Sequence, residues 1–416
     1  MFPQGGLCEL ILLCLPALQH VSLSAPVTEN SNIYTTQGDK VTLPCLMDCP
    51  PGTPVTKVTG KWEWQDREHD SRVQTIVQYL GSVPQRGAIS LATRSNVHSS
   101  YSSGNFGLNI ASVQAEDGGI FKCDFRFKTY TAQATVQLYV VQVTSNSSNP
   151  LLQGEGVSLR CHTPAGQVSW TGPHGVRRTE NPLLLERVSL QEGGKWTCSV
   201  EFTSGESLLV SYQLVVIGFT ESPDETIYLP AGSSALLPCS LNLLPSWDSV
   251  GGGWFRAGAE LLVLKASASG WEWRPVQESH LQAGSGRSNR RDLSVSLRSA
   301  TMSAGDEYQC QLRLHHRSMS RRVRVTVIQV NASEPGSVKV GANVSLECRL
   351  THSSQLTHLR WRQNRSSSSG TVSRRGRTSH TIHLVGVSRR EAGEWICEIL
   401  ENDRAVGKAT YTLNVT

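Results

Sequence analysis

The sequence predicts an all-β chain of four tandem β-sandwich domains, and two observations carry this prediction. The first is a short strand pattern that recurs four times and ends each time in a cysteine. The second is a tryptophan and then another cysteine-bearing strand after every copy, so the order cysteine, tryptophan, cysteine repeats. The chain has 416 residues, which is enough for two to four domains of ordinary size. We therefore expect four domains, each with its own core.

The first half of each repeat has the pattern of a strand with one face in the core. Alternate residues of a strand share a face, so an apolar-x-apolar-x-Cys pattern directs the cysteine inward. The four copies are Val41-x-Leu43-x-Cys45, Val157-x-Leu159-x-Cys161, Ala235-x-Leu237-x-Cys239 and Val344-x-Leu346-x-Cys348. The tryptophans that follow them are Trp62 or Trp64, Trp170, Trp254 and Trp361.

The second half of each repeat places an aromatic residue two positions before the second cysteine. The four copies are Asp117-x-Gly119-x-Phe121-x-Cys123, Glu192-x-Gly194-x-Trp196-x-Cys198, Asp306-x-Tyr308-x-Cys310 and Glu391-x-Gly393-x-Trp395-x-Cys397. This arrangement resembles the immunoglobulin fold, in which an inter-sheet disulfide packs on a buried tryptophan and the aromatic residue holds a corner. The resemblance implies the disulfides Cys45–Cys123, Cys161–Cys198, Cys239–Cys310 and Cys348–Cys397.

The spacing of the cysteines sorts the four domains into two kinds. Paired cysteines lie 78 and 71 residues apart in copies one and three, but only 37 and 49 in copies two and four. Long spans are typical of variable-type domains with extra strands, and short spans of compact constant-type domains. We predict a signal peptide at 1–24, variable-type domains at 25–140 and 218–328, and constant-type domains at 141–217 and 329–416.

The N-terminus and the sequons indicate the secretory pathway. The apolar run from Leu10 to Leu15, followed by small residues up to Ser24, predicts a cleaved signal peptide. No later segment approaches the roughly 20 apolar residues of a membrane span. We therefore expect a secreted chain, or a cell-surface chain if an anchor lies beyond residue 416. Five Asn-x-Ser/Thr sequons are candidate glycosylation sites: Asn146, Asn331, Asn343, Asn364 and Asn414.

Several functional classes are disfavoured by the composition. The cysteines never occur in the tight clusters that bind zinc, and the twelve histidines show no metal-ligand spacing. No Ser/His/Asp grouping indicates catalysis. The net charge of +5 is modest for this length and does not indicate nucleic-acid binding. We expect no enzyme activity, no cofactor and no metal.

Within the immunoglobulin-like proteins, the chain resembles the lymphocyte activation gene 3 protein family, in the group shared with the helper T-cell co-receptor for class II MHC. The shared features are Trp-x-Cys in the short domains, the long-short alternation, and the passage from Tyr212–Phe219 to Tyr228–Ser234. The third-domain cysteines Cys239 and Cys310 also fit this family. The first domain departs from it, because an Arg/Ser-rich segment at 67–103 stands where a proline-rich insertion is known.

Candidate ligand contacts lie in the first domain, between the tryptophan strand and the next turn-rich stretch, where variable-type domains often present a contact face. Tryptophan, tyrosine and arginine are the usual anchors of protein interfaces. The candidates are Trp64, Arg67, Arg72, Tyr79 and Arg86. Either Trp62 or Trp64 is the core tryptophan, and the setting Lys61-Trp62-Glu63 favours Trp62.

Two further features allow two interpretations each. Cys49 is the odd cysteine of the mature chain, because Cys45 continues the strand alternation. It forms either an intermolecular bridge in a homodimer or an unpaired, partly buried thiol. Arginines concentrate late in the chain, where they bind an acidic ligand or a sulfated glycan, or form solvated strand faces. The alternation of Arg322 and Arg324 with valines favours a strand face.

The resemblance implies an immune receptor ectodomain, or its soluble form, that binds a protein on another cell. A class II MHC-like ligand and restraint of T-cell activation are the functions expected from this family. One alternative is a helper T-cell co-receptor for class II MHC. Another is a secreted decoy or adhesion protein with immunoglobulin-like domains.

Overall fold

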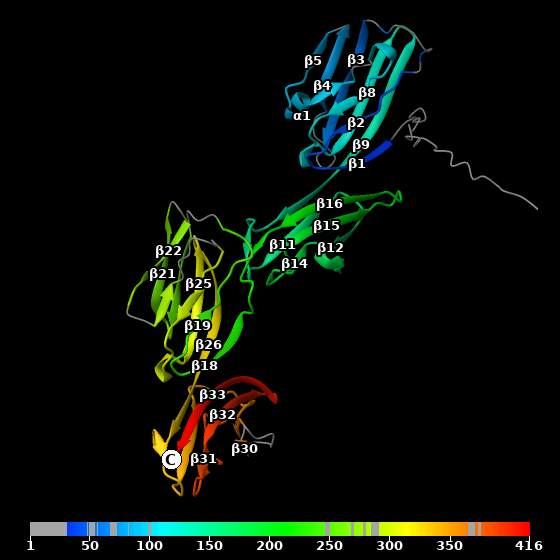
Figure 1. The fold of residues 1–416 in the computed structure, drawn as a ribbon. Coiled ribbons are helices and arrows are strands. Elements are labelled where there is room, and N and C mark those ends of the chain that lie inside the picture. The colour runs from blue at the N-terminus through cyan, green and yellow to red at the C-terminus, as the bar shows by residue number, and fades with distance from the viewer. Residues whose placement is uncertain are drawn as a thin grey trace, which may run out of the picture. The chain divides into compact units, whose positions relative to one another are not determined.

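The fold was analysed in a computed structural model of the chain (Figure 1). It describes residues 31–47, 49, 55, 57–66, 73–81, 83–98, 101–245, 250–267, 270–277, 280–283, 291–364, 371–372 and 376–416. The predicted signal peptide at 1–24 lies outside these residues. Strands dominate throughout, and the all-β prediction is confirmed.

Domain 1 is a sandwich of two sheets. In the larger one the strand order is β9-β8-β3-β4-β5, with β1 parallel to β9, and the smaller one has the order β2-β7-β6. The elements are β1 (Ser31–Thr36), β2 (Val41–Leu43), β3 (Val58–Asp66), β4 (Gln74–Gly81), β5 (Pro84–Arg86), α1 (Ser90–Arg94), β6 (Ser95–Val97), η1 (Tyr101–Ser103), β7 (Leu108–Ile110), η2 (Ala115–Asp117), β8 (Gly119–Phe127) and β9 (Tyr130–Ser145).

Domain 2 is smaller, as its short cysteine spacing predicts. Strand β11 pairs with β14, and β12 pairs with β13, both antiparallel. Its elements are β10 (Leu151–Leu152), β11 (Val157–His162), β12 (Gln167–Thr171), η3 (Pro173–Gly175), β13 (Arg177–Arg178), β14 (Leu183–Leu185), β15 (Gly194–Glu201), β16 (Ser207–Leu214) and β17 (Val216–Ile217).

Domain 3 repeats the strand plan of domain 1. Its larger sheet has the order β22-β21-β20-β25-β26 with β18 parallel to β26, and its smaller sheet the order β19-β24-β23. The elements are β18 (Asp224–Pro230), β19 (Ala235–Leu237), β20 (Val250–Arg256), β21 (Ala259–Ser267), β22 (Gly270–Pro275), β23 (Leu281–Ala283), β24 (Val295–Leu297), η5 (Met302–Ala304), β25 (Asp306–Leu314) and β26 (Arg317–Ala332).

Domain 4 is joined to domain 3 by strand β26, which continues from one sandwich into the next and pairs there with β28. Its second sheet has the order β27-β33-β32-β29-β30. The elements are β27 (Ser337–Val338), β28 (Val344–Leu350), β29 (Thr357–Gln363), β30 (Thr371–Val372), β31 (Ser379–Leu384), β32 (Gly393–Glu401) and β33 (Arg404–Val415).

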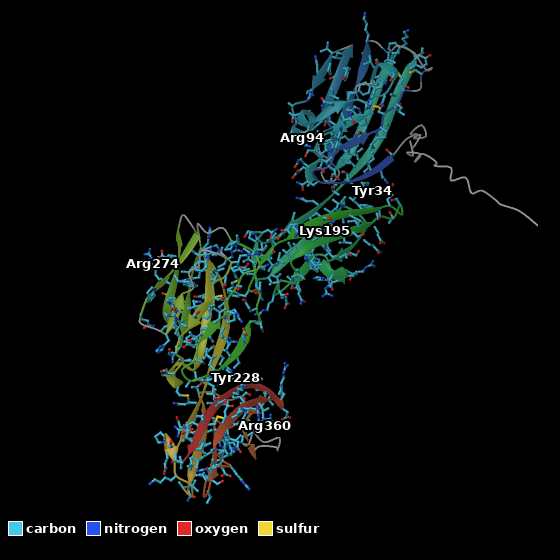
Figure 2. All side chains as sticks on the ribbon, in the orientation of Figure 1. Tyr34, Arg94, Lys195, Tyr228, Arg274 and Arg360 are labelled. Atoms are coloured by element: carbon cyan, nitrogen blue, oxygen red, sulfur yellow. A yellow bond between two sulfur atoms is a disulfide. The ribbon has the colours of Figure 1, made fainter. Side chains whose placement is uncertain are left out.

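Continuous strands cross two of the predicted domain limits. The limit at 140 falls inside β9, and the limit at 328 falls inside β26. At the second limit the Tyr228 hydroxyl donates a 2.5 Å hydrogen bond to Glu401 Oε1 of domain 4 (Figure 2). Burial of the phenol and the nearby Glu401 carboxylate raise the pKa of Tyr228. Strand pairing and this bond attach domain 4 to domain 3 without a separate linker.

Each domain contains one disulfide, and the pairs are Cys45–Cys123, Cys161–Cys198, Cys239–Cys310 and Cys348–Cys397. One fully buried tryptophan accompanies each disulfide: Trp62, Trp170, Trp254 and Trp361. Trp62, and not Trp64, therefore occupies the core of domain 1. The corner aromatics of the short domains, Trp196 and Trp395, donate their indole N–H to backbone carbonyls at 2.9 and 3.0 Å.

The described residues contain neither a membrane-spanning helix nor a cluster of metal ligands. No helix among them is long and apolar enough to cross a membrane. Nor do they contain a group of three or more His, Cys, Asp or Glu side chains placed to hold a metal ion.

Candidate functional site

The candidate site is the exposed face of the larger sheet of domain 1, which we call the front face. Strand alternation forms it: on β8, Phe121, Cys123 and Phe125 are buried, whereas Lys122 and Arg126 are exposed. Register then places outward residues of β4, β3, β8 and β9 in three rows. The rows are Leu80-Thr59-Arg126-Thr131, Gln78-Lys61-Asp124-Gln133 and Thr75-Glu63-Lys122-Thr135.

The front face is polar and its charges are mostly paired. Lys61 Nζ lies 2.6 Å from Glu63 Oε1, and Arg126 Nη2 lies 3.4 Å from Asp124 Oδ2. Lys122 is exposed and has no charged partner among the described residues. Three cations thus face two anions, which leaves a single excess positive charge. Such a surface favours a partner of complementary charge, and it contributes to association rate and specificity more than to affinity.

An apolar tip lies at one end of the front face. Leu80 and Val83, in the hairpin between β4 and β5, are 60% and 68% exposed. Leu80 lies in the same row as Arg126, two strands and so about 10 Å away. Lys128, in the β8–β9 hairpin, places its ammonium 5.1 Å from the centre of the Phe127 ring. Exposed apolar side chains beside cations are the composition expected of an anchor in a protein interface.

The five predicted contact residues fall in different surroundings. Trp64 is half-buried, and its indole N–H donates to Asp117 O at 3.2 Å, so it supports the corner of the sandwich. Tyr79 is buried, with its ring edge-on to Phe125. Arg86 is exposed on β5, where its guanidinium donates to the carbonyls of Ala92 and Thr93. Arg67 and Arg72 lie outside the described residues.

Sequence reasoning missed the front face, although its signal is present. Along β8 the charges at Lys122, Asp124 and Arg126 alternate with buried aromatics. That period of two marks a solvated strand face, but it does not show which neighbouring strands complete the surface. Leu80 and Val83 had no such signal, because an apolar pair in a strand is expected to be buried.

The remaining predicted features have definite positions in the structure. Cys49 is unpaired and half-buried, and it packs against the core of domain 1. All five sequon asparagines are exposed, four of them in domain 4. Arg322 and Arg324 lie on an exposed face of β26, where they pair with Asp224 and Glu307.

Family models match the first and the fourth domain of the chain. A family model of the immunoglobulin V-set domain matches residues 28–141, and one of the immunoglobulin domain matches residues 334–406. The chain belongs to the immunoglobulin superfamily. This membership agrees with the four disulfides and the four buried tryptophans described above.

Within this superfamily the chain is similar to proteins of lymphocytes. It is 23% identical to rat lymphocyte activation gene 3 protein, over 97% of the chain and 79% of the relative. The human protein of that name is 23% identical over 74% of the chain and 57% of the relative. The dog T-cell surface glycoprotein CD4 is 29% identical over 52% of the chain and 46% of the relative. The chain thus spans little more than half of the human relative's length.

Proposed function

We propose that the chain is the extracellular part of an immune cell-surface receptor, or its soluble form, and that it is not an enzyme. Its front face binds a protein ligand on another cell, and that ligand is class II MHC or a similar protein. Binding restrains T-cell activation. Similarity to lymphocyte activation gene 3 protein along almost the whole chain supports this proposal.

The single observation that carries the binding surface is the apolar tip of Leu80 and Val83 beside the cations of the front face. Domain 1 has no sequon between residues 25 and 140, so none of the candidate glycans is attached to the front face itself. Interface energy concentrates in a few buried anchors surrounded by polar contacts. Burying Leu80 and Val83 in a partner would supply such an anchor, while Lys122 and Arg126 would select an acidic rim.

A binding assay with substituted tips tests the proposal. The soluble chain is titrated onto antigen-presenting cells that express class II MHC and onto matched cells that lack it. Leu80→Asp with Val83→Asp should weaken binding at least tenfold, because a charge would replace each anchor. Leu209→Asp is the matched control, since Leu209 is 64% exposed in domain 2 and lies outside the front face. The control should bind as the unsubstituted chain does.

Equal binding by cells with and without class II MHC would reject the ligand. Unchanged binding by the tip variant, or equal losses in the tip variant and the control, would reject the surface. The sign of the signal is tested separately, with T cells that express the chain fused to a membrane anchor. Increased activation on ligand engagement would favour a helper-type co-receptor instead.

A further inference from the structure

The strand registers of domains 1 and 3 match residue by residue, and this match shows where the two domains differ. Trp62 and Trp254 lie opposite the second cysteine of their domains, and each indole donates to a backbone carbonyl, at 2.8 and 3.0 Å. Counting from these tryptophans, Trp64 of domain 1 corresponds to Arg256 of domain 3. The strand register around the smaller sheets likewise matches Arg94 with His280.

In domain 1 the space beside the corner is filled by side chains. Asp117, six residues before the second cysteine, accepts two hydrogen bonds of 2.7 Å from the Arg94 guanidinium (Figure 2). Trp64 packs over the same corner and donates to Asp117 O. Gly119 makes room for it, because a Cβ there would lie 2.7 Å from the Trp64 indole nitrogen. Domain 1 therefore closes this end of its core.

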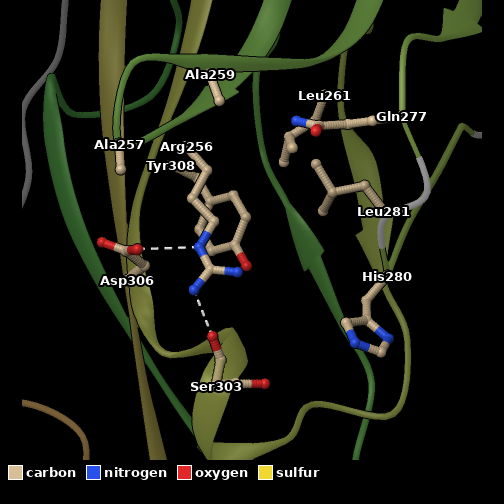
Figure 3. A pocket seen from close by; sticks show the side chains of 10 residues that line it. All are labelled: Arg256, Ala257, Ala259, Leu261, Gln277, His280, Leu281, Ser303, Asp306 and Tyr308. Carbon is tan, nitrogen blue, oxygen red and sulfur yellow. Dashed lines mark hydrogen bonds and ion pairs between the residues drawn. The ribbon is translucent and has the colours of Figure 1, made fainter.

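Domain 3 has none of the three side chains that close this corner in domain 1. Ala304 stands where Asp117 does, and His280 stands where Arg94 does, so the buried ion pair is absent here. Arg256 stands where Trp64 does, and Asp306 stands where Gly119 does. The Arg256 Nε lies 2.9 Å from Oδ2 of Asp306. Beside this pair lies a half-open cavity of about 790 Å³, lined in part by residues of β20, β21, β23 and β25 (Figure 3). That volume is in the range of sites that hold small organic ligands.

The cavity has an apolar wall and a polar wall. Leu261, Leu281 and the ring of Tyr308 are buried and line one part of it. The Tyr308 hydroxyl is already used, because it donates to Ala304 O at 2.9 Å. The apolar part therefore offers hydrophobic contact and no free hydroxyl donor. An apolar group of a ligand would displace water from it at a gain of roughly 25 cal/mol for each Å² buried.

The polar wall contains several hydrogen-bond donors that are not used. Asp306 accepts from Arg256 and from the Glu307 N–H, and Ser303 O accepts from Arg256. The guanidinium has five N–H donors, of which only two are used among the described residues. The His280 ring is also without a hydrogen-bond partner in the part of the chain that the structure describes. These unused donors of Arg256 and His280 match a ligand that brings acceptor oxygens.

We propose that this cavity of domain 3 binds a small carboxylic acid with an apolar body. The carboxylate accepts hydrogen bonds from Arg256 and His280, and the body lies against Leu261, Leu281 and Tyr308. Charged hydrogen bonds of this kind are about twice as strong as neutral ones. No sequon lies between residues 218 and 328, so the opening is free of N-linked glycan.

The test uses the whole soluble chain and 4-phenylbutyrate as the probe, measured by saturation-transfer NMR and calorimetry. The neutral analogue 4-phenylbutanol and acetate are the matched comparison compounds. Phenylbutyrate should bind at least tenfold more tightly than either of them. The double variant His280→Arg with Ala304→Asp rebuilds the ion pair of domain 1 inside the cavity. It should lose phenylbutyrate binding at least tenfold while domain 3 melts no lower, which separates loss of the site from loss of the fold.

Two further variants complete the test. Ala259→Trp narrows the cavity from an exposed position and should also reduce binding, so the result does not depend on the double variant folding. Arg313→Ala removes an exposed arginine outside the cavity and should bind phenylbutyrate normally. The proposal is overturned if phenylbutyrate does not bind at millimolar concentrations, if phenylbutanol binds equally well, or if both cavity variants bind unchanged.

Discussion

Domains 1 and 3 share one strand plan and yet use different chemistry at the same corner. Both contain a glycine two residues before the core tryptophan, Gly60 and Gly252, where a Cβ would lie 2.4 or 2.3 Å from a carbonyl oxygen of the neighbouring strand. At the corner, domain 1 has a buried ion pair under a tryptophan, and domain 3 has a half-exposed ion pair beside a cavity. The backbone plan therefore tolerates either solution, and in domain 3 described residues at this corner line a cavity.

The largest expected effect concerns what the two domains share. Removing either disulfide, as Cys45→Ala with Cys123→Ala or as Cys239→Ala with Cys310→Ala, should destabilise its domain by about 4 kcal/mol, because the bridges close loops of 78 and 71 residues. Hydrogen-exchange mass spectrometry reads β8 and β25 separately. A large loss of amide protection in one domain but not in the other would show that the two domains do not depend equally on their disulfides.

The second prediction separates the two ion pairs. Arg94→Met leaves the buried Asp117 carboxylate without its partner, which should cost domain 1 about 3 to 5 kcal/mol. Arg256→Met breaks a pair whose side chains are each 33% exposed, and the expected cost to domain 3 is about 1 kcal/mol or less. Denaturant unfolding followed by domain-resolved hydrogen exchange measures both. Equal costs would contradict the difference in burial.

A third prediction concerns a backbone carbonyl at equivalent positions of the two domains, which accepts its hydrogen bond from a different side chain in each. Asp117 O accepts from the Trp64 indole, whereas the corresponding Ala304 O accepts from the Tyr308 hydroxyl. Trp64→Phe and Tyr308→Phe remove these donors, and Tyr308→Phe should cost about 1 to 2 kcal/mol because its carbonyl is buried. Adding Phe121→Tyr to Trp64→Phe should restore part of the loss in domain 1. No restoration would mean that Trp64 acts through packing alone.

The smallest effect is a dependence on pH in domain 3. Burial opposes ionisation of Asp306, but hydrogen bonds from Arg256 and the Glu307 N–H, with the charge of Arg256, lower its pKa below the usual range. A lowered pKa in the folded state stabilises the domain above the unfolded value of about 3.9, and this stabilisation is lost as the pH falls through the folded pKa. With Asp306→Asn, the melting temperature of domain 3 should fall less steeply as the pH is lowered into the acid range. An unchanged pH dependence would show that Asp306 does not contribute to it.

Some of this molecule could be read from individual residues. Strand alternation with cysteine, tryptophan and aromatic positions indicated four sandwiches, because a buried strand face must repeat every second residue. The two kinds of domain followed from cysteine spacing. The setting of Trp62 correctly favoured it as the core residue. Its neighbour Trp64 supports the corner, and its predicted ligand contact stays a prediction. Alternation along a strand shows which side chains face outward. It does not show whether an outward side chain is half-buried at the corner of the sandwich, as Trp64 is, or fully exposed.

The sequence by itself thus determined the all-β class, the four repeats and the strands that carry the paired cysteines, since these depend on local periodicity. Only the tertiary structure decided which outward residues of β3, β4, β8 and β9 form the front face, because register joins residues as distant in sequence as Thr59 and Arg126. The same holds for the cavity in domain 3. It arises where Ala304, His280 and Arg256 replace three residues of domain 1 that meet only in the folded sandwich.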